Sequence, residues 1–168
     1  MFDSHLNFGN LLWGCAKSKF IKKIENLQKK CIRNVALKNF RAHTEPLFKE
    51  LGILKFTDKL SYCQSVFMHK YRHGKLPPSF SNIFTETVMS NELQSRHNDY
   101  NYLNEPAIKK YLENFPLKQI IFNWNALNLD LKATGDIDEF ETLLKEWYLK
   151  QYSLETDCLG GCYSCNTI

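Results

Sequence analysis

One amphipathic segment, residues 18–35, limits most strongly what this chain can fold into. At about 100° per residue, its apolar side chains fall within one arc of roughly 140°. Its basic side chains fall within the opposite arc, roughly 120° wide, and no acidic side chain interrupts them. The pattern predicts an amphipathic α-helix, the clearest in the sequence. The apolar arc holds Phe20, Ile21, Ile24, Leu27, Cys31, Ile32 and Val35, and the basic arc holds Lys19, Lys22, Lys23, Lys29, Lys30 and Arg33.

Capping signals predict two further helices after this one. Thr44 is a good N-cap for a short helix, Pro46 is tolerated in its first turn, and Gly52 suits its exit. The next helix begins at residue 57 or 58 and ends near residue 73, where Gly74 stops it. Its predicted apolar stripe is Leu60, Cys63, Phe67 and Tyr71.

Prolines and a polar loop interrupt the second half of the chain. Residues 85–105 predict an irregular loop, with a short strand near residues 100–103, and Pro116 separates two helical or irregular pieces. The last helix starts after Gly135, with Asp136 at its cap and Glu139 three residues later, a variant of the capping box. Its predicted core face is Ile137, Phe140, Leu143, Leu144, Trp147, Tyr148 and Tyr152.

These elements predict a mainly α fold with one helical domain, residues 1–152, and a Cys-rich tail, residues 153–168. The length of 168 residues suits a single domain. No apolar run approaches the roughly 18 residues of a membrane span, and no signal peptide is visible. We therefore expect an intracellular protein, in the cytoplasm or nucleus, without a membrane partner or a disulfide framework.

The positive charge of the chain is concentrated in residues 17–41. Nine basic side chains stand there against Glu25 alone, a local charge of +8, whereas the whole chain carries +4. A lysine face can lie along a phosphate backbone without reading its sequence, so a polyanionic partner is expected. The alternative is a solvated helix face, which normally mixes both signs. The candidate nucleic-acid-binding residues are the basic arc together with Lys38 and Arg41.

A second anion site is conceivable beside this segment. Arg41, His43 and Thr44 come just before the short helix, where free backbone N–H groups can bind phosphate. The plainer interpretation, which we favour, is a capping turn that carries a surface arginine.

The C-terminal cysteines have a spacing that suits metal binding. Cys158, Cys162 and Cys165 form a C-x3-C-x2-C pattern, and two glycines between them let the backbone fold around an ion. They supply three thiolates for a structural zinc that needs four ligands. A distant histidine (His43, His69, His73 or His97) or a partner chain would complete the site. The alternative is an exposed, reduced tail, and the other cysteines, Cys15, Cys31 and Cys63, are predicted core residues.

No motif in the sequence predicts catalysis. There is no Gly-rich phosphate loop, no H-E-x-x-H and no G-x-S-x-G. Asp136 and Asp138 are better explained as residues of a first helical turn. The residues alone therefore predict a helical binding domain that is not an enzyme.

Several stretches resemble a known family in their order and spacing. They read SHLNFGNLLWG, IENLQKKCIRNV, FRAHTEPLFKELGIL and FMHKYRHGKLPPSF, followed by FPLKQIIFNWNAL, FETLLKEWYLKQY and the Cys-rich end. Together they resemble the region C-terminal to the polymerase core in non-LTR (LINE-type, jockey-like) retrotransposon reverse transcriptases. The resemblance covers nearly the whole chain and is most specific over residues 24–80.

The resemblance implies a thumb-like helical domain that holds RNA or an RNA–DNA duplex. That role would fall on the basic arc, with Lys22, Lys29 and Arg33 at its centre, and a zinc-knuckle-like role on the terminal cysteines. The catalytic Mg²⁺ of such RNA-directed DNA polymerases is held by palm aspartates in an F/Y-x-D-D motif, which this sequence lacks. The chain thus resembles a non-catalytic fragment whose upstream polymerase core is missing.

A protein-interaction module is the competing interpretation. The apolar N-terminal residues Leu6, Leu11, Leu12 and Trp13 could drive self-association or bind another protein. Measuring the size of the chain with and without residues 1–14 separates the two hypotheses.

Overall fold

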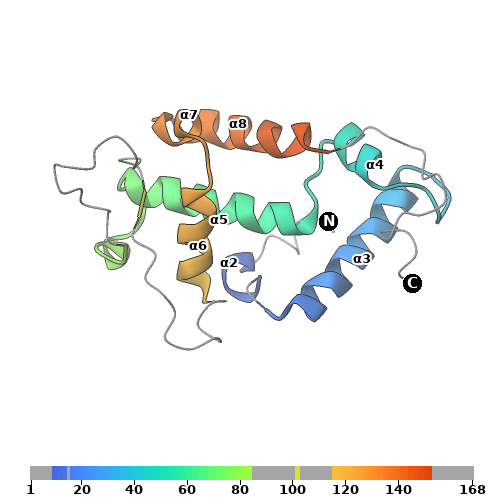
Figure 1. Cartoon of the computed structure of the whole chain (residues 1–168), viewed down its shortest axis with the longest axis horizontal. Helices are drawn as coiled ribbons and strands as arrows, with labels where there is room; N and C mark the ends of the chain where they lie inside the picture. The colour runs from blue at the N-terminus through green and yellow to red at the C-terminus, as the bar shows by residue number, and fades with distance from the viewer. Residues whose placement is uncertain (1–8, 15, 85–100, 103–114, 153–168) are drawn as a thin grey trace. The chain divides into compact units, whose positions relative to one another are not determined.

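The computed structural model describes residues 9–14, 16–84, 101–102 and 115–152. This part of the chain is mainly helical, so the predicted fold class is confirmed (Figure 1). The predicted Cys-rich tail, most of the 85–105 loop and Leu6 lie outside the described residues. The elements are α2 (Asn10–Trp13), α3 (Ser18–Val35), α4 (Glu45–Glu50), α5 (Phe56–Arg72), the 3₁₀ turn η1 (Pro78–Phe80), α6 (Pro116–Asn125), α7 (Leu129–Ala133) and α8 (Ile137–Lys150).

The chain divides into two compact units. The first comprises Met1–Ala16 and Leu60–Leu144, and the second comprises Lys17–Lys59 and Lys145–Ile168. The chain passes between the units after Ala16, within α5 and within α8. The expectation of one helical domain over residues 1–152 stays a prediction.

The helix ends follow the local signals closely. Gly52 and Gly74 adopt left-handed φ values of 61° and 62°, as expected for glycines that end a helix. At the start of α8, the backbone N–H of Glu139 donates to Oδ2 of Asp136 at 3.1 Å. This bond lowers the pKa of Asp136. Thr44 precedes α4 as predicted, but its side chain makes no capping hydrogen bond.

The core of the first unit is built around aromatic rings of α6 and α8. Trp124 and Phe140 are fully buried, with ring centroids 6.1 Å apart. The ring of His69 on α5 stacks on Phe140 at 4.3 Å, and its Nε2 lies 2.7 Å from the carbonyl oxygen of Thr134. Burial lowers the pKa of His69. Because a carbonyl oxygen can only accept, Nε2 is the donor in this hydrogen bond.

The stripe predicted for α5 is only partly buried. Leu60 is buried, but Cys63, Phe67 and Tyr71 are half-buried, whereas Met68 and His69 are completely buried. Because neighbouring segments cover α5 on more than one side, its buried residues do not follow a single stripe. Of the core face predicted for the last helix, Phe140, Leu144 and Tyr148 on α8 are buried, as is Tyr152 just after it. Ile137 and Trp147 are half-buried, and Leu143 is 39 % exposed.

A buried lysine holds residues 101 and 102 in the first unit. Lys132 is 1 % exposed, and its Nζ donates to Oδ1 of Asn101 at 2.9 Å and to the carbonyl oxygen of Asn125 at 3.1 Å. The amide of Asn125 pairs with the backbone of Tyr102, accepting from its N–H at 3.1 Å and donating to its carbonyl at 2.9 Å. Burial lowers the pKa of Lys132 to about 8.

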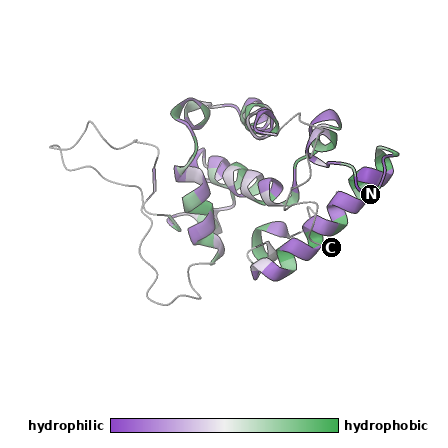
Figure 2. Cartoon of the chain, turned by 45° about the vertical axis from the view of Figure 1, so that its right-hand side comes forward, coloured by the Kyte–Doolittle hydropathy of each residue, from purple (hydrophilic) through white to green (hydrophobic). Residues whose placement is uncertain are grey.

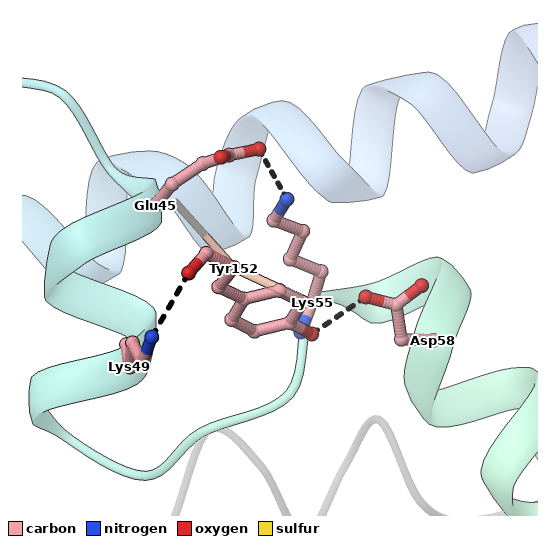
Figure 3. A network of polar contacts seen from close by, with 5 residues as sticks. All are labelled: Glu45, Lys49, Lys55, Asp58 and Tyr152. Atoms are coloured by element: carbon pink, nitrogen blue, oxygen red, sulfur yellow. Dashed lines mark hydrogen bonds and ion pairs between the residues drawn. The ribbon is translucent and has the colours of Figure 1, made fainter. Parts of the chain in front are cut away.

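Tyr152 joins the end of α8 to the other parts of the second unit (Figure 3). Its hydroxyl donates to Oδ2 of Asp58 at 2.6 Å and accepts from the backbone N–H of Lys55 at 2.9 Å. The Lys55 ammonium lies 4.5 Å from the centre of the Tyr152 ring and pairs with the carboxylate of Glu45. Lys49 donates to the Tyr152 carbonyl at 3.1 Å. These contacts fix the connector after α4, against which α3 also packs.

Candidate nucleic-acid interface

The orientation of α3 is set by a polar residue, Gln28. Its side chain is 3 % exposed, and Nε2 donates to the carbonyl oxygen of Leu54 at 2.9 Å. Its Oε1 accepts from the backbone N–H of Phe56 at 2.8 Å. Leu54 belongs to the connector between α4 and α5, and Phe56 is the first residue of α5. Gln28 thereby ties α3 to the same connector that Tyr152 holds.

The predicted apolar face of α3 is therefore only partly buried. Ile32 lies on the same side of the helix as Gln28 and is 4 % exposed. Phe20 and Leu27 lie about 80° and 100° away from Gln28 round the helix and are 47 % and 55 % exposed, whereas Val35 is 66 % exposed as the last residue of α3. The predicted amphipathic helix is present, but part of its apolar arc remains exposed. The second unit covers only the side centred on Gln28 and Ile32.

The basic arc of α3 is presented to solvent. Lys19, Lys22, Lys23 and Lys30 are exposed, and Lys29 is partly exposed. None of these five lysines makes an ion pair with any residue that the structure describes. Figure 2 shows hydrophilic and hydrophobic residues alternating along α3. The arrangement is a row of unneutralised ammonium groups beside an exposed apolar strip.

Arg33, predicted as a phosphate contact, has a structural role as well. Its Nε donates to the carbonyl oxygen of Ala42 at 2.8 Å, and its own carbonyl accepts from the N–H of Lys38 at 2.9 Å. These bonds hold the turn after α3 against the basic arc. Within that turn Leu37 has a φ of 52° and is 93 % exposed.

The same turn brings further positive charge to the C-terminal end of α3. Lys38 and Arg41 are both exposed. The backbone N–H of Arg41 donates to Oδ1 of Asn39 at 3.1 Å, which shapes a local turn. Thr44 is 7 % exposed, so its hydroxyl is not presented to an external phosphate. Because the Thr44 side chain makes no capping hydrogen bond, the capping-turn interpretation of residues 41–44 stays a prediction.

The predicted zinc ligands Cys158, Cys162 and Cys165 lie outside the described residues, as do His97 and Cys15. In the part of the chain that is described, no three His, Cys, Asp or Glu side chains are placed to hold a metal ion. Cys31 and Cys63 are half-buried rather than fully buried. Sγ of Cys63 accepts a hydrogen bond from Asn10 at 3.2 Å.

Sequence reasoning missed two features of this interface. The first is Gln28, whose position inside the apolar arc was a signal that it meets polar groups. The second is a pair of exposed rings, Phe20 and Phe40, each of which lies next to a cation. The adjacent pairs Lys19–Phe20 and Phe40–Arg41 are visible in the sequence, but the exposure of the rings is not.

Comparison with known proteins provides no assignment for this interface. No protein-family model matches the chain, and neither a curated protein nor a solved structure matches it. Among the described helices, none combines the length and the apolar character needed to cross a membrane.

Proposed function

We propose that this chain binds nucleic acid by electrostatic contact between the basic arc of α3 and the phosphate backbone. The observation that carries the proposal is the row of exposed lysines without acidic partners among the described residues. Each phosphate that such a row neutralises releases condensed counterions, so affinity falls steeply with salt. Lysine contacts of this kind position the strand and read no sequence.

The resemblance to LINE-type reverse transcriptases gives this binding a biological setting. We propose that the chain acts as the non-catalytic C-terminal part of such a polymerase, with RNA or an RNA–DNA hybrid lying along α3. Gln28 and Arg33 support this role because they fix α3 and the following turn without using the exposed lysines. The proposal requires no catalytic activity of this chain.

Replacing Lys22, Lys23 and Lys30 together with alanine should reduce the salt dependence of binding. Each phosphate contact contributes about 0.9 to the slope of log K against log salt, so the slope should become shallower by two to three units, about 0.9 for each lysine. Arg33 is left intact because its removal would also release the turn after α3. Fluorescence anisotropy with a labelled oligonucleotide at several salt concentrations measures this slope.

The matched control carries the same change of net charge elsewhere. Lys75, Lys145 and Lys150 are exposed and lie outside α3, so replacing them with alanine should leave the slope nearly unchanged. An equal decrease of the salt slope in the two triple variants would show that binding follows net charge alone. That outcome would contradict a dedicated interface on α3.

A second candidate function is protein interaction through the N-terminal segment. The observation that favours it is Leu12, which is 74 % exposed on α2, whereas Leu11 is half-buried. If α2 mediates self-association, the apparent mass in size-exclusion chromatography should rise with concentration, and Leu12→Ser should abolish the rise. Leu129→Ser, at another exposed leucine, should have no effect. A wild-type chain that elutes as a monomer at every concentration would contradict self-association.

A further inference from the structure

Two exposed phenylalanine rings accompany the basic arc. Phe20 lies in the first turn of α3 and is 47 % exposed, and Phe40 lies in the turn after α3 and is 66 % exposed. The Lys19 ammonium lies 4.9 Å from the centre of the Phe20 ring, and the Arg41 guanidinium lies 5.2 Å from that of Phe40. Each ring is thus paired with a cation at the surface.

The two rings are spaced along the length of the basic arc. Phe20 is close to the N-terminal end of α3, and a rise of about 1.5 Å per residue places Val35 roughly 22 Å further along the axis. Phe40 follows that end, in the turn that Arg33 holds through the carbonyl of Ala42. The lysines of the basic arc therefore lie between one aromatic–cation pair and the other.

This combination matches the chemistry of an unpaired strand. Single-stranded nucleic acid offers exposed base faces that stack on aromatic rings, and phosphates that follow a row of cations. A duplex keeps its base faces inside the stack, so exposed rings beside the lysines would add nothing to its binding. Solvent-exposed cations such as Lys19 and Arg41 can meet the phosphate next to a stacked base.

We propose that the basic arc selects single-stranded nucleic acid, with bases stacked on Phe20 and Phe40 and the intervening phosphates on the lysines. The inference rests on the proposed function of the same surface and names its substrate class. It differs from the duplex expected from the resemblance. The aliphatic neighbours Leu27 and Val35 are exposed as well, but they offer no face for a base.

The test compares one strand in two states. The probe is a labelled oligouridylate of about 20 nucleotides, which exceeds the usual site size, used alone and annealed to oligoadenylate. The variant is Phe20→Leu combined with Phe40→Leu, which retains apolar bulk and removes both rings. Its affinity for the single strand should fall about tenfold or more, because base–aromatic stacking accounts for that much. Duplex affinity and the salt slope should stay unchanged, because every lysine is retained.

The matched control is Phe122→Leu, which removes a ring that is 62 % exposed on α6 in the first unit. It should leave both affinities unchanged, and circular dichroism melting confirms that each variant is folded. Equal affinity of the wild-type chain for the two probes, with no effect of the double variant, would overturn the single-strand proposal and leave the proposed function intact. Absence of salt-dependent binding to either probe would overturn both.

Discussion

Replacing Gln28 with methionine is expected to lower the free energy of unfolding by about 2–6 kcal/mol. Methionine keeps nearly the same length and volume but can neither donate to the Leu54 carbonyl nor accept from the Phe56 N–H. Both backbone groups would then be unpaired at a buried site, and each such group costs about 1–3 kcal/mol. The loss is large because one side chain satisfies two backbone groups, one in the connector after α4 and one at the first residue of α5.

Urea denaturation followed by circular dichroism measures this effect. The control is Gln151→Met, because Gln151 is exposed just after α8 and should tolerate the change within about 0.5 kcal/mol. A change at Gln28 no larger than the change at Gln151 would show that α3 is held by its apolar residues alone. The orientation of the basic arc would then need a different explanation.

The stability of the chain should rise with pH above neutrality because of Lys132. Its pKa is lowered from 10.5 to about 8 by burial, so the unfolded chain binds a proton in this window that the folded chain has released. Below this pH range the buried, charged Lys132 therefore destabilises the folded chain. The destabilisation decreases as pH rises and the folded chain releases the proton. Between about pH 7.5 and about pH 9.5 the free energy of unfolding should increase by about 2 kcal/mol.

Urea titrations across this pH range test the prediction, with Lys132→Met as the variant that removes the titrating group. The readout is the pH slope and not the absolute stability, because methionine also leaves Asn101 and the Asn125 carbonyl without their donor. The wild-type rise should be absent in Lys132→Met and retained in Lys145→Met, whose lysine is exposed. A rise that persists without Lys132 would assign it to other groups. The range stops below pH 10 because Tyr62 and Tyr152 have raised pKa values and oppose the trend at higher pH.

Local signals predicted the helices well. The expected segment 18–35 coincides with α3, Gly52 and Gly74 stop α4 and α5, and Asp136 caps α8. Such features depend on the 3.6-residue period, on the left-handed conformation that glycine permits and on short-range hydrogen bonds. All of these act within a few residues of the chain, so they can be recognised without knowledge of the tertiary fold.

Long-range packing decided which side chains became buried, and here the predictions were less accurate. On α5, three residues of the predicted stripe are only half-buried: Cys63, Phe67 and Tyr71. The polar His69 is completely buried instead, because its Nε2 has a hydrogen-bond partner in the carbonyl of Thr134. Lys132 is buried for a comparable reason, since Asn101 and the Asn125 carbonyl accept from it. A polar residue can be buried when a distant segment supplies its hydrogen-bond partner, and the period of a single helix carries no record of that segment.

The surface of α3 depends both on the local sequence and on long-range packing. Its existence and its separation from the apolar arc follow from the order of residues in α3, because a helix places side chains about 100° apart. Which part of the apolar arc is covered was decided by the connector at Leu54 and the start of α5 at Phe56, which both pair with Gln28. The exposure of Phe20 and Phe40 beside the lysines was likewise not visible in the sequence, because burial depends on which segments meet in space.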